Sequence, residues 1–232
     1  VFISCWEKYT SMMHEYPFFV ELNEDGTLNE ESVMEALKYM ETLVKEELVA
    51  PEDKTSSGMD AYKRLTGGSA SFLTGPTSFV SRSTNEEECS VVGQIAPILM
   101  PGKEAKSEVT MALPEGLGVT KFSENKEAAK KFVEWYTSAD MQKELNASNS
   151  AIPTRNSVLK SLVEDGTIKN AGAMMDEAER IVSPFPNGIP AYYAEMSSAM
   201  YNAINKMALG EMTAEEAFED MNAKITELVE QE

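Results

Sequence analysis

The order of segments in the middle of the chain constrains the fold more than any other feature. A glycine-rich turn and a short apolar run, 67–73, lead to a Gly-Pro turn, and residues 91–97 then have the composition of a buried strand. After a polar connection, residues 111–119 show a second strand-like pattern, and residues 123–136 carry apolar side chains at helical spacing. Strands that alternate with helices predict an α/β architecture in which helices cover the sheets.

Apolar side chains three and four residues apart predict helices elsewhere in the chain. Asn29 is expected to cap a helix over 30–49, which Pro51 ends, and Thr213 begins a capping box for the last helix. Ser123 and Thr154 are expected to start helices over 123–136 and 154–162, and Thr137-Ser138-Ala139-Asp140 resembles a capping box for a helix that runs toward Leu145. Further helices are expected over 60–65, 170–182 and 191–209. The apolar stripe of the last helix comprises Ala217, Met221, Ile225 and Leu228. A short strand over 16–22 and a turn at 23–26 precede the first of these helices.

The charge balance limits the kinds of molecule that the protein is expected to bind. The chain has 39 acidic and 20 basic residues and a net charge of −19, which disfavours binding to nucleic acid and to anionic membranes. A neutral ligand such as a sugar suits this balance, and so does a cation. The simpler explanation is that the acidity keeps a secreted protein in solution. No apolar run approaches the roughly 20 residues that a membrane-spanning helix needs.

Few residues form patterns suited to catalysis or metal binding. The single histidine, His14, excludes a site that needs two imidazoles, and Cys5 and Cys89 are either a disulfide pair or two scattered thiols. Two S-x-x-K matches, at 123–126 and 157–160, lack the companion motifs of the serine enzymes. The acidic run 21–32 lacks the glutamate that ends a calcium loop. The sequence therefore predicts no catalytic residue, no metal site and no cofactor.

Taken in order, the segments resemble one family, the extracellular solute-binding proteins of ABC importers, and within it the carbohydrate-binding group that includes maltose-binding protein. One matching stretch, 123–132, fits the pattern S-x-N-K-E-A-A-x-x-F, and residues 116–119 fit G-x-G-I/V. The other similar segments are 67–76, 91–102, 150–155 and 209–218. The resemblance extends over nearly the whole chain.

The resemblance implies a periplasmic-binding-protein-like fold of type II. It implies a receptor that binds a carbohydrate and delivers it to the membrane permease of an ABC transporter, without making or breaking a bond. Such a receptor is extracellular, either periplasmic or held at the cell surface as a lipoprotein. The alternatives are the same fold binding a polyamine, metal chelate or peptide, a glycan hydrolase with two facing carboxylates, and a non-catalytic protein-interaction module.

The family's first βαβ units have no counterpart here, so the chain is expected to be a C-terminal fragment. Residues 1–113 and 169–232 would form the C-terminal lobe, and 114–168 would belong to an incomplete N-terminal lobe. The helix that carries Phe132 and Trp135 would then lack its packing partner. An exposed aromatic face of this kind is expected to favour self-association or disorder of the fragment.

Aromatic rings and a Gly-Pro turn are the first candidates for the ligand site. Trp6, Tyr192 and Tyr193 are expected to stack on the C–H faces of a sugar, and core packing is the alternative for each ring. The turn Gly75-Pro76-Thr77 lets backbone approach a ligand closely, and in the family a stacking Trp often follows the Gly-Pro pair. Thr77 at that position predicts a hydrogen bond to a hydroxyl and disfavours a long maltodextrin-like ligand.

Two charged residues complete the expected site. Glu115, followed by Gly116 after the second expected strand, is able to accept from two hydroxyls or to face a cation. Arg155, after Pro153-Thr154, is able to donate to a pair of vicinal hydroxyls. A solvated surface position is the alternative for both.

Overall fold

A computed structural model describes residues 22–49, 51–54, 58–73, 75, 77–99, 116–169, 171–181 and 188–231. The chain divides into two compact units. Unit 1 comprises Val1–Gly75, Met100–Met111 and Arg180–Glu232, and unit 2 comprises Pro76–Leu99 and Ala112–Glu179. These bounds differ from those of the two lobes expected from the sequence, and the assignment of segments to lobes remains a prediction.

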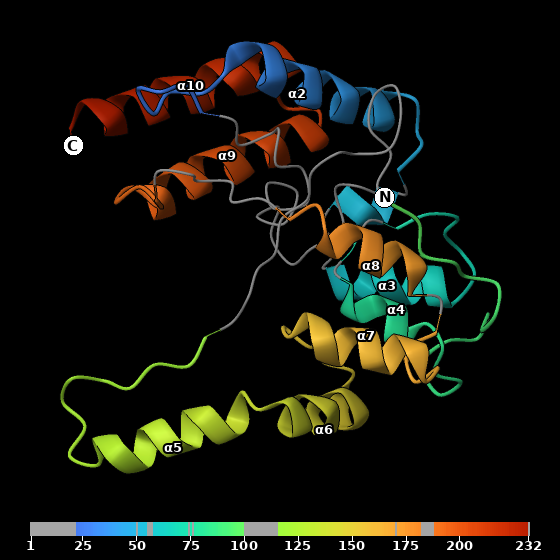
Figure 1. The fold of residues 1–232 in the computed structure, drawn as a ribbon. Helices are drawn as coiled ribbons and strands as arrows, with labels where there is room; N and C mark the ends of the chain where they lie inside the picture. The colour runs from blue at the N-terminus through green and yellow to red at the C-terminus, as the bar shows by residue number, and fades with distance from the viewer. Residues whose placement is uncertain are drawn as a thin grey trace. The chain divides into compact units, whose positions relative to one another are not determined.

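Unit 1 is built around three helices that pack on one another, α2 (Glu30–Lys45), α9 (Tyr193–Ala208) and α10 (Ala214–Glu230) (Figure 1). It also contains the 3-10 helix η2 (Pro51–Lys54) and α3 (Gly58–Thr66). The apolar side chains recur every three or four residues, so each of the three helices has one apolar face to bury. The largest fully buried side chains are Val33, Leu37, Met196, Met200, Ile204, Met207, Met221 and Ile225. Methionine suits such a core because its unbranched side chain fills irregular space.

The starts of α2 and α10 confirm two expected caps. The side chain of Asn29 accepts the N–H of Ser32 at 3.1 Å. Thr213 and Glu216 form the expected capping box, in which the Thr213 hydroxyl accepts the N–H of Glu216 at 3.2 Å. In return the Glu216 carboxylate accepts the N–H of Thr213 at 2.8 Å. Both helices therefore begin where a local side chain satisfies their first free amides.

Unit 2 contains α4 (Ser78–Arg82), α5 (Lys126–Tyr136), α6 (Ala139–Asn149), α7 (Asn156–Glu164) and α8 (Gly172–Ala178). Its core lies mainly between α7 and α8, where the buried side chains are Val158, Leu159, Leu162, Ile168, Ala171 and Met174. The N-cap of α6 is Ser138, one residue after the Thr137 with which the expected capping box begins, and its side chain accepts the N–H of Met141 at 3.3 Å. This core is smaller than that of unit 1 and reaches none of the residues of α5.

The strand expected over 91–97 is absent, because these residues form a turn followed by irregular chain. Of the second expected strand, 111–119, the first five residues lie outside the described part, and 116–119 form no strand. The expected strand 16–22 falls almost wholly outside it as well. A strand is stable only where neighbouring strands pair with its backbone groups. An isolated antiparallel bridge joins Leu22 and Leu28, and no sheet forms within the ranges given above.

Several expected helix boundaries are wrong. α2 ends at Lys45 rather than near residue 49, and Glu47 beyond it has a positive φ of 54°. α5 begins at Lys126, because Ser123 accepts the N–H of Asn125 and caps no helical amide. Similarly, Thr154 does not cap α7. Helix α6 continues to Asn149, α8 covers only part of 170–182, and α9 begins at Tyr193 rather than at residue 191.

Candidate functional site

The residues expected to contact a ligand fall into three groups. Trp6, Pro76 and Glu115 lie outside the described residues. Unit 1 contains Gly75, Tyr192 and Tyr193, and unit 2 contains Thr77, Gly116 and Arg155.

The turn at Gly75 and Thr77 is exposed. The carbonyl of Thr77 accepts the N–H of Val80 at 3.0 Å and so begins α4. This hydrogen bond uses only the backbone of Thr77. Its exposed hydroxyl is chemically able to donate one hydrogen bond and to accept others, as the expected contact with a sugar requires.

Gly116 lies in irregular chain ahead of α5 and is exposed. A Cβ atom at this position would have no heavy atom within 4 Å. The described surroundings therefore do not require glycine here. The place of Gly116 in the ligand site stays a prediction.

Arg155 joins three segments of unit 2. Its backbone N–H donates to the side-chain oxygen of Gln142 at 3.1 Å, and its Nε donates to the carbonyl of Thr137 at 2.8 Å. The amide nitrogen of Gln142 in turn donates to the Thr154 hydroxyl at 2.9 Å. These bonds tie the junction of α5 and α6 to the start of α7, where Arg155 is the N-cap residue. The two terminal guanidinium nitrogens carry the remaining donors, and these have the fork geometry that vicinal hydroxyls accept.

Tyr192 and Tyr193 stand at the start of α9 and pack, half-buried, against the core of unit 1. The Tyr192 hydroxyl lies 2.8 Å from the position that a Cβ on Gly26 would occupy, so a larger residue at 26 would clash with it. The pKa of the Tyr193 phenol is raised, because the effect of burial outweighs the opposing effect of a hydrogen bond with the Ser197 side chain. Both rings thus have a structural role, and a contact with ligand remains a prediction.

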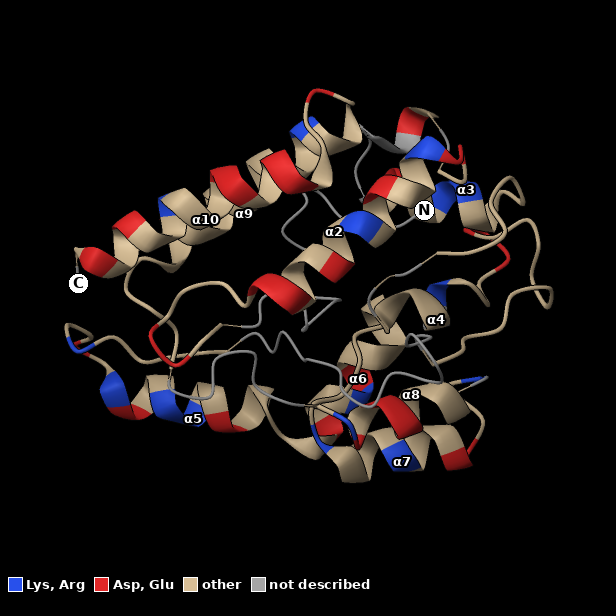
Figure 2. Ribbon diagram, turned by 90° about the horizontal axis from the view of Figure 1, so that it is seen from above, with Lys and Arg blue, Asp and Glu red and all other residues tan. Residues whose placement is uncertain are grey.

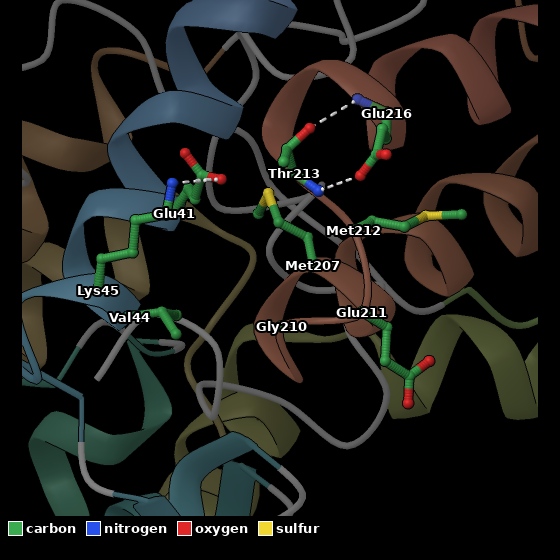
Figure 3. A pocket seen from close by; sticks show the side chains of 9 residues that line it. All are labelled: Glu41, Val44, Lys45, Met207, Gly210, Glu211, Met212, Thr213 and Glu216. Atoms are coloured by element: carbon green, nitrogen blue, oxygen red, sulfur yellow. Dashed lines mark hydrogen bonds and ion pairs between the residues drawn. The ribbon is translucent and has the colours of Figure 1, made fainter.

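Unit 1 also contains a shallow depression between α2 and the corner that joins α9 to α10, which sequence reasoning missed (Figure 3). Its volume is about 200 Å³, and it is lined by Glu41, Val44, Lys45, Met207, Gly210, Glu211, Met212, Thr213 and Glu216. The Glu41 carboxylate accepts from Lys45 Nζ at 2.8 Å and from the N–H of Ala214 at 3.3 Å. Glu216 and Thr213 bond to each other in the capping box. Its polar groups hold α10 against α2, so the depression is a structural junction.

The charged groups offer no cluster suited to a metal within the described ranges. No three histidine, cysteine, aspartate or glutamate side chains there are arranged to hold an ion. Acidic residues are spread along the helices of both units, with lysines among them on α5 (Figure 2). No helix among those given above is both long and apolar enough to cross a bilayer.

The local contacts alone do not identify a protein family, but comparison with known proteins does. A family model described as "bacterial extracellular solute-binding protein" matches residues 6–176. The structure of maltose-bound MalE3 from T. maritima superposes with a TM-score of 0.79 and 22% identity, over 96% of this chain and 59% of that one. An ABC transporter solute-binding protein from Agrobacterium vitis S4, with bound D-mannitol, superposes with a TM-score of 0.70 and 15% identity, over 98% and 60%.

These structural likenesses confirm the expected fold class, that of the periplasmic binding proteins. They extend over nearly the whole of this chain. The chain spans about 60% of the length of the solved structures that it matches.

Proposed function

Because the chain belongs to the bacterial extracellular solute-binding proteins, we propose that the intact protein binds a carbohydrate and delivers it to the membrane permease of an ABC transporter. The observation that carries this proposal is the shared fold with two receptors that hold a sugar and a sugar alcohol. The ligand is bound and released without chemical change. The protein works outside the cytoplasmic membrane, as its family does.

The chemistry of the expected site supports a polyhydroxylated ligand. Hydroxyls that enter a closed site without partners each cost about 1–3 kcal/mol, so fixed donors and acceptors set selectivity. Arg155 is a fixed donor, because its Nε bond to the Thr137 carbonyl holds the guanidinium plane before ligand arrives. Thr77 and Glu115 supply further hydroxyl partners, and Trp6, Tyr192 and Tyr193 supply ring faces. Gly75, Pro76 and Gly116 allow the backbone to come close.

We further propose that residues 114–168 belong to the N-terminal lobe of the intact receptor and that 1–113 and 169–232 form its C-terminal lobe. The separation of α5, α6 and α7 from α2, α9 and α10 into different compact units agrees with this division, whereas α4 and α8, which it gives to the C-terminal lobe, lie with α5, α6 and α7 in unit 2. Ligand would bind between the lobes and favour their closed arrangement, which the permease would recognise.

Thermal-shift and calorimetric titrations of the intact protein test the ligand class. Maltose and D-mannitol are the first probes, with spermidine and a tripeptide as probes of the other cargo classes. A ligand at 100 times its Kd stabilises the folded state by about 2.7 kcal/mol, which a melting curve detects. Stabilisation by spermidine, with no response to any sugar or polyol, would reject the carbohydrate assignment and would give the charge of −19 a role in cation binding.

The variant Arg155→Lys tests the role of the guanidinium fork. It keeps the positive charge but loses paired donation, and hydrogen bonds to charged groups contribute about 1.5–3 kcal/mol, so affinity should fall at least about tenfold. Lys160→Arg, at an exposed position on the same helix α7, is the matched control and should bind as the parent does. Equal affinities of the two variants would exclude Arg155 from the site.

A further inference from the structure

Two buried amide side chains of α6 contact the segment that connects α6 to α7. Gln142 and Asn146 lie one turn apart on α6 and are only 9% and 7% exposed. Asn146 donates to the carbonyl of Ala151 at 3.0 Å. Gln142 contacts both Thr154 and Arg155, at 2.9 and 3.1 Å. Burial of an amide costs free energy unless the amide is hydrogen-bonded, so these contacts help to fix the conformation of the connection.

The backbone amide of Arg155 decides which way the Gln142 side chain is turned. A backbone N–H only donates, so the Gln142 oxygen must face it. The Gln142 nitrogen then faces the Thr154 hydroxyl, and because this nitrogen only donates, the hydroxyl oxygen must accept. The orientation of the buried amide thus follows from the network itself.

The Thr154 hydroxyl is therefore left with a proton to donate. A hydroxyl has one O–H donor besides its acceptor lone pairs, and the bond from Gln142 occupies only a lone pair. No acceptor within the part of the chain that the structure describes takes this proton, and Thr154 caps no amide of α7. Thr154 is exposed, so the proton is available to a molecule that arrives from solvent.

Arg155 carries further donors next to this hydroxyl in the chain. Its Nε donates to the carbonyl of Thr137 just ahead of α6, and Gln142, which holds Thr154, lies near the start of the same helix. Two consecutive side chains are thus fastened to the start of α6. Together they offer one hydroxyl proton and the terminal nitrogens of a guanidinium group. Oxygen atoms of a ligand are the acceptors that such a set of donors matches.

We propose that Thr154 is a further ligand-binding residue, which donates its hydroxyl proton to an oxygen of the ligand, and that Gln142 is the positioning residue that leaves this proton free. The inference rests on the proposed place of Arg155 in the ligand site. A sugar or polyol suits the arrangement, because each of its oxygens has lone pairs for these donors. Spermidine does not, because its nitrogens are protonated at neutral pH and have no lone pair to offer.

Substitutions of Thr154 test the contact by calorimetric titration of the intact protein with maltose and D-mannitol. Thr154→Val keeps the shape and removes the hydroxyl, so affinity should fall about two- to tenfold, whereas Thr154→Ser should bind nearly as the parent does. Ser148→Ala removes a hydroxyl from an exposed position on α6 and is the matched control, with unchanged affinity. Equal affinities of Thr154→Val and the parent would overturn the proposal and leave the carbohydrate assignment intact.

Gln142→Glu tests the positioning role. A carboxylate still accepts the N–H of Arg155, but it only accepts, so the Thr154 hydroxyl must turn and donate to it. Affinity should therefore fall as it does in Thr154→Val, and the two substitutions together should cost no more than either alone. Additive losses would reduce Gln142 to a structural role and would overturn its part in the proposal.

Amide hydrogen exchange at Arg155 provides a readout without ligand. Gln142→Leu removes the acceptor and should accelerate exchange there, and Asn146→Leu, which removes a neighbouring buried amide, should accelerate it less. Unchanged exchange in Gln142→Leu would overturn the inference whatever the cargo. Stabilisation of the parent by the tripeptide alone, with weaker binding to Thr154→Val, would reject the carbohydrate assignment and retain this inference. Stabilisation by spermidine alone would reject both.

Discussion

Removal of the Glu41 carboxylate should destabilise unit 1 through the first turn of α10. The side chain of Glu41 is 15% exposed and accepts the N–H of Ala214, a residue that is 0% exposed. In Glu41→Ala this amide would lose its acceptor where water has little access, at a cost of about 1–3 kcal/mol. Loss of a negative charge beside a helix N-terminus adds about 0.3–1 kcal/mol. We therefore expect a loss of roughly 1–4 kcal/mol in the free energy of unfolding.

Two companion variants separate the sources of this loss. Glu41→Gln retains an acceptor oxygen and removes only the charge, so it should cost about 1 kcal/mol or less. Lys45→Ala breaks the ion pair with Glu41, but the lysine side chain is 65% exposed, and such a pair contributes about 0.3–0.5 kcal/mol. The expected order of destabilisation is Glu41→Ala, then Glu41→Gln, then Lys45→Ala.

Urea unfolding followed by circular dichroism measures the differences, with each transition fitted separately because the chain has two compact units. Amide hydrogen exchange at Ala214 gives the local readout, since Glu41→Ala should accelerate exchange there before global unfolding. A Lys45→Ala variant as unstable as Glu41→Ala would place the energy in the ion pair. Unchanged exchange at Ala214 would refute the contact itself.

Three further predictions concern the core and caps of unit 1. Thr213→Ala should cost about 0.5–2 kcal/mol in urea unfolding, and Thr213→Ser should restore most of it, because the hydroxyl cap returns. Met200→Ala should cost about 2–5 kcal/mol, since this side chain is fully buried. The same change at Met212, which is partly exposed, should cost clearly less. Equal losses would contradict the described core. Burial raises the pKa of Tyr193, so the native state holds the phenol proton more tightly than the unfolded state, and stability falls as the pH rises above about 10. Tyr193→Phe should reduce that alkaline loss in thermal unfolding, and an unchanged pH profile would contradict it.

The sequence predicts helices and caps well where the interactions join residues that are close together in the chain. Asn29 and Thr213 each cap the helix expected of them, because a cap needs only a side chain and an amide three residues later. Thr154 fails for a non-local reason. Its hydroxyl accepts from Gln142, 12 positions earlier, and no local pattern shows that contact. Residues 91–97 fail as a strand because strands depend on partners elsewhere in the chain.

The candidate site was less predictable than the fold. Sequence reasoning named Arg155 as a donor to ligand but missed its Nε bond to Thr137, which depends on how α6 turns into α7. Likewise, the close approach of Tyr192 to Gly26 depends on the packing of segments far apart in sequence. Two signals near the depression are readable in the sequence, the capping box that begins at Thr213 and the spacing of four residues between Glu41 and Lys45 on one helix. The hydrogen bond between Glu41 and Ala214 joins residues 173 positions apart, and no local pattern predicts it.

The long stretch of sequence between α2 and its packing partners affects how the nascent chain folds. Helix α2 leaves the ribosome long before α9 and α10, with the whole of unit 2 made in between. At bacterial rates of about 5–20 residues per second, the apolar stripe of Val33, Leu37 and Met40 waits roughly 7–30 s for its partners. Unit 1 is completed only after α9 and α10 have been made. Such a topology keeps the apolar face of α2 exposed in the nascent chain until its partner helices follow.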